Sequence, residues 1–191
     1  MVLTIYLISA PLLLAAAFVI FRVLVRRDYQ AQGHLSPFTS FLELLIWILY
    51  VGFPYIYNPT DWVLVWFADT PTNLTLKIIG SILVVVGMGI ALVAMGVLGV
   101  RRTMGQHGKM LEQTWPYRMS RNPQLIGGGL AVVGVAVIWP SWYALGWVVF
   151  YGIMGQMMVL AEEEHLRRAY GQEYSRYCEQ TPRYFSFSKP N

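Results

Sequence analysis

Hydrophobic residues occur along this chain in long blocks rather than in alternation with polar ones. Because the hydrocarbon core of a bilayer is about 30 Å thick, a helix needs roughly 20 mostly apolar residues to cross it. The pattern predicts about five transmembrane helices, of which the fourth is short for a full span. The blocks run from about Leu3 to Val25, Phe38 to Tyr57, Lys77 to Val100, Gln124 to Trp139 and Trp142 to Ala161.

The connection between the fourth and fifth blocks is only Pro140-Ser141. A turn this short joins two neighbouring antiparallel helices, so these blocks predict a tight helical hairpin. The fifth block continues without a break into a polar helical pattern after Ala161. The expected fold is therefore an all-α, polytopic membrane protein that ends in a polar C-terminal helix.

The composition supports one membrane domain, residues 1–191, with three spans in residues 1–100. The chain is 56% hydrophobic and 13% charged, against roughly 25% charged residues in soluble domains. The first block is expected to be a retained span, because Arg22, Arg26 and Arg27 follow it and no basic residue precedes it. A cleavable signal peptide has the opposite order.

Thirteen of the 14 Lys and Arg residues flank the same ends of the predicted spans, and only Lys77 lies toward the other side. Since cytoplasmic loops carry an excess of Lys and Arg, the N-terminus is predicted outside and the C-terminus in the cytoplasm. The net charge of +4 is read as this membrane bias rather than as affinity for nucleic acid. An outer aromatic belt is then expected from Trp62, Trp66, Trp139, Trp142 and Tyr143.

Small residues are frequent in the third and fourth blocks, where they let helix backbones approach closely in lipid. The triplet Gly127-Gly128-Gly129 is unusual, because consecutive glycines weaken a helix. It indicates a backbone that closely approaches a neighbour, which is either another helix or a ligand.

The first polar stretch of interest runs from Trp115 to Pro123 and leads into the glycine-rich fourth block. Asn122 suits an N-cap, and Pro123 suits the first helical turn. A helix start attracts anions, and Arg118 and Arg121 beside it are able to grip a carboxylate or phosphate. The alternative is that both arginines only anchor lipid headgroups.

The second polar stretch, residues 162–171, begins with three consecutive glutamates. Glu163 with Arg167 and Glu164 with Arg168 form i,i+4 pairs, as on a solvated helix surface. Glu162 has no such partner, so Glu162 first and Glu163 second are candidates to face inward.

Six further polar side chains have less distinctive expected roles. His165 is interpreted as a surface residue, and no His/Cys/Asp cluster has metal-site spacing. Glu43 is a functional candidate by depth, although it lies close enough to the interface to be hydrated. The lone Cys178 is read as inert, and Tyr170, Tyr174 and Tyr177 recur at helical spacing and suit packing against the membrane surface.

Together the two stretches resemble the isoprenylcysteine carboxyl methyltransferase and phospholipid methyltransferase superfamily of membrane enzymes. The resemblance covers about residues 101–185. Its elements are Arg118, Arg121-Asn122-Pro123 and Gly127, followed by Glu162-Glu163, Leu166, Tyr170-Gly171, Tyr174 and Tyr177. Each element is weak alone, and their order and spacing make the likeness fairly specific.

The resemblance implies a membrane methyltransferase that binds S-adenosylmethionine at the cytoplasmic side and takes a lipid-like substrate laterally from the bilayer. In that family scheme the cofactor pocket would be lined by Arg121, Asn122, Pro123 and Gly127, with Glu162 and Glu163 on the cofactor's ammonium or ribose hydroxyls. Residues nearer the substrate headgroup, and hence candidates for catalysis, would be Tyr117, Arg118 and Arg183.

Departures from the family pattern leave the methyl acceptor open among an isoprenylcysteine-like carboxylate, a small thiol and a phospholipid amine. Asn122 stands where many members have His, and its Asn-Pro form resembles that of phospholipid N-methyltransferases. Leu125 replaces a common Tyr, and Trp115 replaces a common Gly. The tail with Tyr174, Tyr177 and Arg183 leans toward the isoprenylcysteine branch. An ammonium acceptor must first lose a proton, and no buried base is evident, which favours a carboxylate or small thiol.

Two other functions compete with this interpretation. A reductase of the sterol-reductase type has similar C-terminal motifs but binds NADPH, so cofactor binding separates the two. A small transporter or scaffold would carry polar residues at mid-membrane, whereas here they gather at the inner rim. The sequence does not indicate the oligomeric state.

Overall fold

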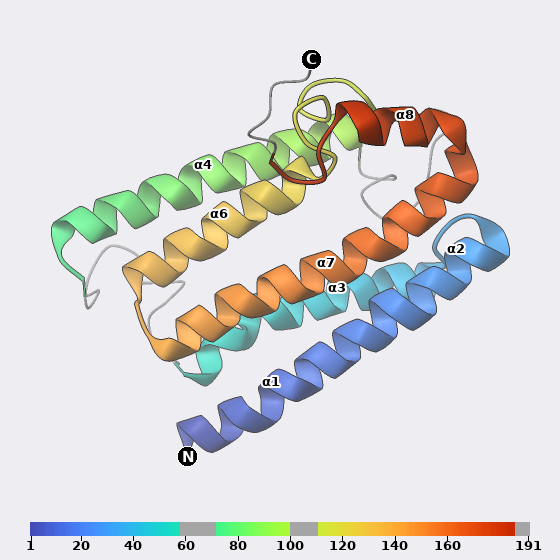
Figure 1. Ribbon diagram of the computed structural model, residues 1–191. Coiled ribbons are helices and arrows are strands. Elements are labelled where there is room, and N and C mark those ends of the chain that lie inside the picture. The colour runs from blue at the N-terminus through green and yellow to red at the C-terminus, as the bar shows by residue number, and fades with distance from the viewer. Residues whose placement is uncertain (58–71, 100–110, 186–191) are drawn as a thin grey trace.

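The computed structural model describes residues 1–57, 72–99 and 111–185, and helices form all the regular structure in these ranges (Figure 1). The N-terminal half contains α1 (Val2–Phe18), the π-helical segment η1 (Val19–Val25), α2 (Arg26–Gln32), α3 (Pro37–Gly52), the 3₁₀ turn η2 (Phe53–Ile56) and α4 (Leu74–Leu98). The C-terminal half contains α6 (Pro123–Ile138), α7 (Trp142–Tyr170) and α8 (Gln172–Gln180).

The helices begin and end at residues suited to those positions. The side chains of Ser36, Asn73 and Ser141 each accept the backbone N–H of the residue three positions on, which caps α3, α4 and α7. Gly33 and Gly171 follow the ends of α2 and α7 with φ of 71° and 51°. Glycine adopts these left-handed angles without the strain that a Cβ would add.

All five predicted apolar blocks correspond to helices in the described residues, and the first helix continues past Val25 to Gln32. Four helices are long and apolar enough to cross a membrane: Val2–Gln32, Pro37–Ile56, Leu74–Leu98 and Trp142–Tyr170. The shorter apolar helix is α6, whose 16 residues span about 24 Å. The prediction of an all-α membrane protein with a short fourth segment is therefore confirmed. The long α1–η1–α2 helix contains a π-helical segment that the hydrophobic pattern did not reveal.

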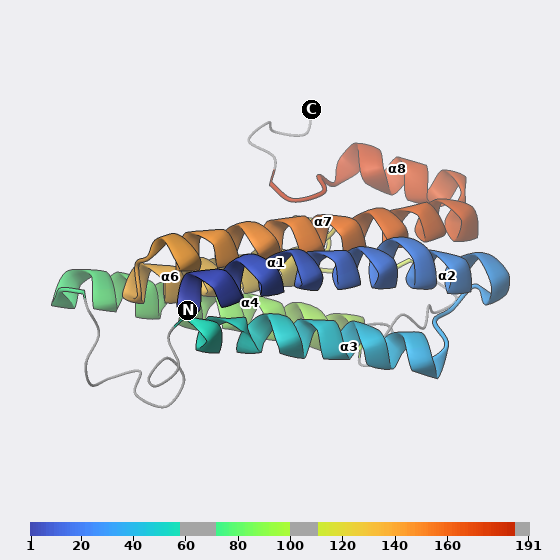
Figure 2. The ribbon, with the colours of Figure 1, turned by 90° about the horizontal axis from the view of Figure 1, so that it is seen from below.

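The helices lie roughly parallel or antiparallel, with α4 and α6 as a pair beside α7, and α1 and α3 on the far side of α7 (Figures 1 and 2). Tyr50 of α3 and Trp147 of α7 hold these two helices together. Their rings stack with centroids 5.2 Å apart, the Tyr50 hydroxyl donates to the Trp147 carbonyl, and the Trp147 indole N–H donates to the Tyr50 carbonyl. These reciprocal bonds keep polar atoms satisfied inside the apolar core.

The α4–α6 pair is joined through glycines that bring the two backbones together. A Cβ on either Gly87 or Gly127 would lie 2.5 Å from the carbonyl oxygen of the other, and Gly80 and Gly134 approach each other similarly. Only residues without a side chain fit such a crossing. The packing role predicted for the small residues of these two helices is therefore confirmed.

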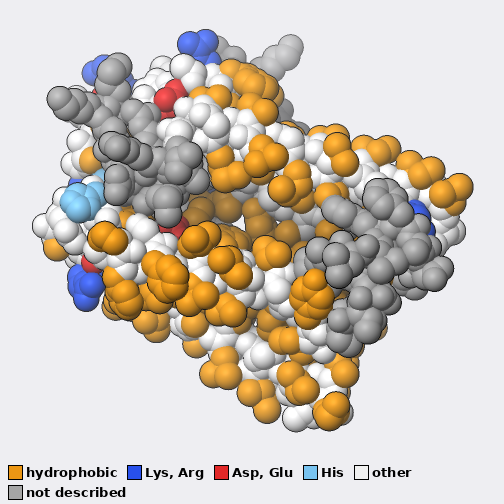
Figure 3. Space-filling view, turned by 180° about the vertical axis from the view of Figure 1, so that it is seen from behind, with side chains coloured by type: hydrophobic (Ala, Val, Ile, Leu, Met, Phe, Trp, Pro, Cys, Tyr) orange, Lys and Arg blue, Asp and Glu red, His pale blue; other side chains and the backbone are white. Residues whose placement is uncertain are grey.

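Charged side chains gather at the end of the bundle formed by α2, α8 and the C-terminal turns of α7, which we call the polar end (Figure 3). The middle of that face is hydrophobic. At the opposite end, Trp139, Trp142 and Tyr143 flank the α6–α7 turn, in line with an aromatic belt. Trp62 and Trp66, expected in the same belt, lie outside the described residues.

The orientation of the polar end toward the cytoplasm stays a prediction, and cysteine labelling tests it. In a Cys178→Ser background, Arg176→Cys on the exposed face of α8 should react with an impermeant maleimide only after cells are permeabilised. Pro140→Cys, exposed at the α6–α7 turn, is the matched control and should react from outside intact cells. The reverse pattern would show that the polar end faces outward.

Candidate functional site

The segment before α6 docks the C-terminal tail of the chain through its backbone. The Arg121 amide donates to the Pro182 carbonyl at 2.9 Å. The Ser120 hydroxyl and the Asn122 side-chain amide both donate to the Arg183 carbonyl at 3.1 Å. Asn122 is the N-cap residue and Pro123 begins α6 as predicted, but the Asn122 side chain binds the tail rather than capping the helix.

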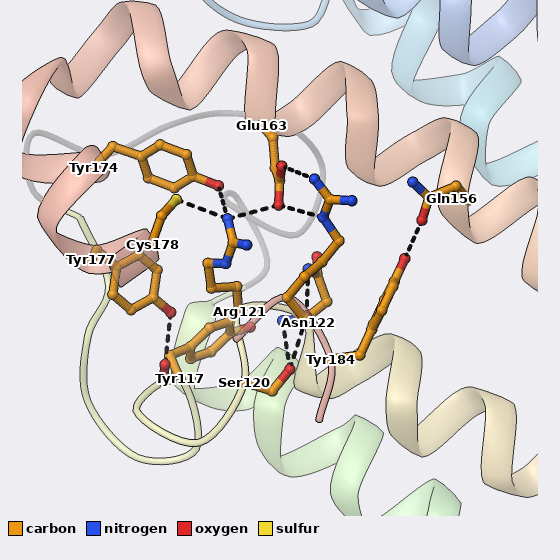
Figure 4. A network of polar contacts seen from close by, with 11 residues as sticks. Tyr117, Ser120, Arg121, Asn122, Gln156, Glu163, Tyr174, Tyr177, Cys178 and Tyr184 are labelled. Atoms are coloured by element: carbon orange, nitrogen blue, oxygen red, sulfur yellow. Dashed lines mark hydrogen bonds and ion pairs between the residues drawn. The ribbon is translucent and has the colours of Figure 1, made fainter. Parts of the chain in front are cut away.

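Glu163 is the centre of the charged contacts between this segment and the tail (Figure 4). Its carboxylate lies 2.8 Å from Arg121 Nη1 and accepts two hydrogen bonds from Arg183, at 2.9 Å from Nε and 2.7 Å from Nη2. Only 7% of the Glu163 side chain and 11% of the Arg121 side chain are exposed, against 34% for Arg183. We call these three residues the arginine–glutamate node; charge-assisted contacts of this kind are among the strongest hydrogen bonds in proteins.

Helix α8 covers the node with one face. Arg121 Nη1 also lies 3.3 Å from the Tyr174 hydroxyl and 2.8 Å from Cys178 Sγ, and the Tyr177 hydroxyl donates to the Tyr117 carbonyl at 2.7 Å. Tyr174 and Tyr177 are buried, so they pack against the 111–122 segment rather than merely on the membrane surface. Burial raises the pKa of both phenols, and the hydrogen bond to Glu163 raises the pKa of Arg183. The hydrogen bond to Glu163 therefore favours the charged form of Arg183.

Tyr117 and Arg118, the other two residues expected near a substrate headgroup, differ in burial and in contacts. Tyr117 is buried, and its hydroxyl lies 3.2 Å from the Ala94 carbonyl of α4 and 3.2 Å from Gln124 Oε1. Arg118 is exposed and donates to the backbone carbonyl of Gln113. Tyr117 thus ties the segment to α4 and α6, whereas Arg118 lies away from the node.

A cavity of about 390 Å³ lies next to the segment that holds the tail, between α2, α3, α4, α6 and α7. Its polar lining consists of Tyr29, Ser40, Glu43, Gln124, Tyr151 and Glu162, and its apolar lining includes Leu44, Met88, Met95 and Leu98. The consecutive residues Glu162 and Glu163 therefore have different surroundings: Glu162 lines the cavity, while Glu163 is enclosed in the node. Inward positions for these two glutamates agree with the sequence-based expectation.

The three consecutive glycines of α6 have different neighbours. Gly127 is at the α4 crossing, where a Cβ would contact the backbone of Gly87 and Ala91. Gly128 lines the cavity. Both Gly128 and Gly129 face the ring of Tyr151. Of the two neighbours that the triplet indicated, a helix and a ligand, Gly127 meets the helix and Gly128 borders the space available to a ligand.

The surface position predicted for His165 was wrong, and the i,i+4 pair considered for Glu163 does not form. His165 is buried, and its ring stacks on that of Tyr29 with centroids 4.2 Å apart. Glu163 pairs with Arg121 and Arg183 instead of Arg167, because its side of α7 faces the tail rather than solvent.

Glu164 does form its expected contact with Arg168, at 3.8 Å. It also pairs with Arg22 and Arg26 at 2.8 Å. Within residues 1–57, 72–99 and 111–185, no three potential metal ligands gather at one point.

Residues 76–173 match the family model of phospholipid methyltransferases, which is slightly more than half of the 191 residues. The chain belongs to this family. No curated protein and no solved structure gave a match. Phospholipid methyltransferases are membrane enzymes that transfer methyl groups, in agreement with the superfamily indicated by the motifs and with the apolar helices of this chain.

The region that matches the phospholipid methyltransferases includes α4, α6 and α7 with both polar stretches. Arg121, Glu162 and Glu163 lie inside it, whereas Arg183, which completes the node, and Glu43, which lines the cavity, lie outside it. The fold joins these residues to the matched region by tertiary contact alone.

Proposed function

We propose that the chain is an S-adenosylmethionine-dependent methyltransferase whose single membrane domain, residues 1–191, acts on an acceptor dissolved in the bilayer. The observation that carries the proposal is the pairing of Arg121 with Glu163 at 2.8 Å. These residues come from the two polar stretches of a region that matches a methyltransferase family. Their pairing brings the two stretches together at the polar end, which supports one cofactor site there, and we propose that this end is cytoplasmic.

The residues at this site fit the charges of S-adenosylmethionine. Two arginines and one glutamate give the node a net positive charge, and Arg121 Nε is buried without a hydrogen-bond partner. An unsatisfied buried N–H favours an anionic ligand, which suits the carboxylate of the cofactor's methionine moiety. Glu162 has no ion-pair partner in the described part of the chain and suits the cofactor's ammonium or ribose hydroxyls.

The remaining predicted site residues have supporting roles in this proposed function. Glu163 orients Arg121 and Arg183 and is a positioning residue. Asn122 holds the tail, Pro123 fixes the start of α6, and Gly127 allows α4 and α6 to approach. Tyr117 ties the segment to α4, and Arg118 is proposed to contact headgroups at the membrane surface.

When bound, S-adenosylmethionine supplies an electrophilic methyl group on a sulfonium. The contribution of the protein is then mainly alignment of the acceptor with that methyl group and exclusion of water. The tail and α8 cover the node from the aqueous side. The adjacent cavity offers apolar surface for an acceptor that arrives from lipid, so the two ligands are proposed to enter from different sides.

Cofactor binding by the purified protein tests this function. S-adenosylmethionine should bind, and Arg121→Ala should weaken binding about 10- to 100-fold, because a charge-assisted contact contributes about 1.5–3 kcal/mol. Arg118→Ala, which removes an exposed guanidinium from the same segment, is the matched control and should change affinity less than about twofold. Calorimetric titration measures both. Binding of NADPH instead of S-adenosylmethionine would exclude a methyltransferase and support a reductase.

A further inference from the structure

Three arginines gather around Glu164 where the α1–η1–α2 helix packs against α7. Arg22 Nη2 lies 2.8 Å from Glu164 Oε1, and Arg26 Nε lies 2.8 Å from Glu164 Oε2. Arg168 Nη2 lies 3.8 Å from the same Oε2. We call Arg22, Arg26 and Arg168 the arginine cluster. No other carboxylate in the described part of the chain lies within ion-pair distance of it, so the cluster keeps an excess of two positive charges.

The cluster has hydrogen-bond donors that Glu164 does not use. Arg22 Nη2 donates to Glu164 Oε1, whereas Oε2 accepts no hydrogen bond from a described residue and has only ion-pair contacts. Arg22 Nη1 is buried and has no hydrogen-bond partner among the described residues. Arg26 and Arg168 are 48% and 47% exposed, so a ligand is able to reach the cluster. Unused donors and excess charge favour an anion with several oxygens.

The backbone that carries the first of these arginines is unusual. Arg22 lies in the middle of η1, and Arg26 is the first residue of α2. Turns of π-helix are rare and often occur at functional sites. Here the π-helical segment and the turn after it direct two arginines, four residues apart, to one carboxylate of α7.

Exposed apolar side chains lie beside the cluster on the same helix. Phe18, Val19 and Val23 are 50%, 48% and 48% exposed. Phe18 lies four residues before Arg22 and therefore one turn from it along a neighbouring face. The helix is apolar and long enough to cross a membrane, so these side chains are expected to contact lipid. A ligand with an acyl chain is able to contact them while its anionic end lies at the arginines.

We infer that the arginine cluster binds the headgroup phosphate of an anionic phospholipid, with the acyl chains against α1 and η1. Guanidinium groups match the geometry of phosphate oxygens. Basic pockets between transmembrane helices are known to bind anionic lipid headgroups. A phosphate at this point also supplies the acceptor that Arg22 Nη1 lacks among the described residues.

This lipid is distinct from the methyl acceptor. Glu163 faces the tail and Glu162 lines the cavity, whereas Glu164 faces η1 and α2. Helix α1 lies on the side of α7 away from α4 and α6 (Figures 1 and 2). The bound lipid holds the first helix against α7 and does not react. Its binding needs no cofactor, so loss of the proposed methyltransferase function would leave this site intact.

Native mass spectrometry of the purified protein in detergent tests the ligand class. The probes are phosphatidylglycerol, phosphatidylcholine with the same acyl chains, and inorganic phosphate. Phosphatidylglycerol should bind at least about tenfold more tightly than phosphatidylcholine, as expected from a charge-assisted contact. Equal affinity for the two lipids overturns the inference. Displacement of phosphatidylglycerol by an equal concentration of inorganic phosphate would show a site for a soluble anion and overturn it as well.

Variants then separate the cluster from general surface charge. Arg26→Gln should weaken phosphatidylglycerol binding about tenfold. Arg167→Gln, which removes an exposed arginine next to Arg168, is the matched control and should change the affinity less than about twofold. Equal losses in the two variants would assign the preference to overall charge and overturn the site. Arg22→Lys retains the charge without the planar fork and should give an intermediate loss.

Thermal unfolding distinguishes a lipid site from an ion-pair network that only supports the fold. Phosphatidylglycerol should raise the unfolding temperature of the wild type, because a ligand that binds only the folded state stabilises it. The Arg26→Gln protein should unfold close to the wild type without lipid and gain little from phosphatidylglycerol. An Arg26→Gln protein that is destabilised without lipid but keeps the full lipid-induced rise would show a structural role alone and overturn the inference.

Discussion

Replacement of Glu163 by alanine is expected to lower the free energy of unfolding by about 3–5 kcal/mol, because it leaves buried charge without its partner. Only 11% of the Arg121 side chain is exposed, and after the change its guanidinium would keep only Tyr174 and Cys178 as polar side-chain partners. Arg183 would lose both of its side-chain hydrogen bonds, so the tail should also detach more readily. Thermal unfolding in detergent measures the first effect, and limited proteolysis of the tail measures the second.

Two further variants make this result specific. Glu179→Ala removes an exposed carboxylate from α8 and should leave unfolding and proteolysis unchanged. Glu163→Gln retains the side-chain volume and removes the charge, so it should resemble Glu163→Ala if the ion pairs carry the effect. A Glu163→Ala protein with wild-type unfolding and a protease-resistant tail would show that the node does not hold the tail.

The second large effect is expected at the α4–α6 crossing. Gly127→Leu should destabilise the protein by about 3 kcal/mol, the upper part of the usual range for overpacking. The new side chain would meet the backbone of Gly87 and Ala91, and backbone atoms cannot move aside as a flexible side chain does. Unfolding of purified protein in detergent is the measurement.

Gly89→Leu is the matched control for this variant. Gly89 lies on α4, and a Cβ there would meet nothing within 4 Å. The change should be neutral or stabilising, since leucine has a helix propensity better than that of glycine. Equal destabilisation by Gly89→Leu and Gly127→Leu would contradict close backbone packing as the reason for the glycines in these helices.

The spans and their ends were predictable because burial in lipid imposes the strongest pattern that a sequence can carry. A helix that crosses a bilayer must be apolar over most of its length, so α1, α3, α4 and α7 are visible as blocks. The short α6 and its turn were visible for the same reason. The π-helical segment η1 leaves the apolar pattern unchanged, which is why the sequence gave no sign of it.

The site was only partly predictable, because its contacts join residues that are distant in sequence. The i,i+4 rule paired Glu163 with Arg167, and docking of the tail overrode it with Arg183. His165 was predicted to lie at the surface, although it lies four residues after the buried Ala161 and so shares its helix face. That spacing was the signal available for His165.

Glu43 illustrates the limit of the sequence for the cavity. Its depth marked it as a functional candidate, but hydrophobic blocks do not say which helices adjoin. Only the fold places α3 opposite α7 and brings Glu43 near Glu162.

Transfer of label from methyl-labelled S-adenosylmethionine to the lipid fraction of proteoliposomes tests the central claim most directly. The wild-type protein should move label into lipid-soluble product, and Arg121→Ala should do so at least about tenfold more slowly at cofactor concentrations below saturation. Arg118→Ala should stay within about twofold of wild type. If no amphiphile of the amine, carboxylate or thiol class gains label, and the same preparation oxidises NADPH, the chain is not a methyltransferase.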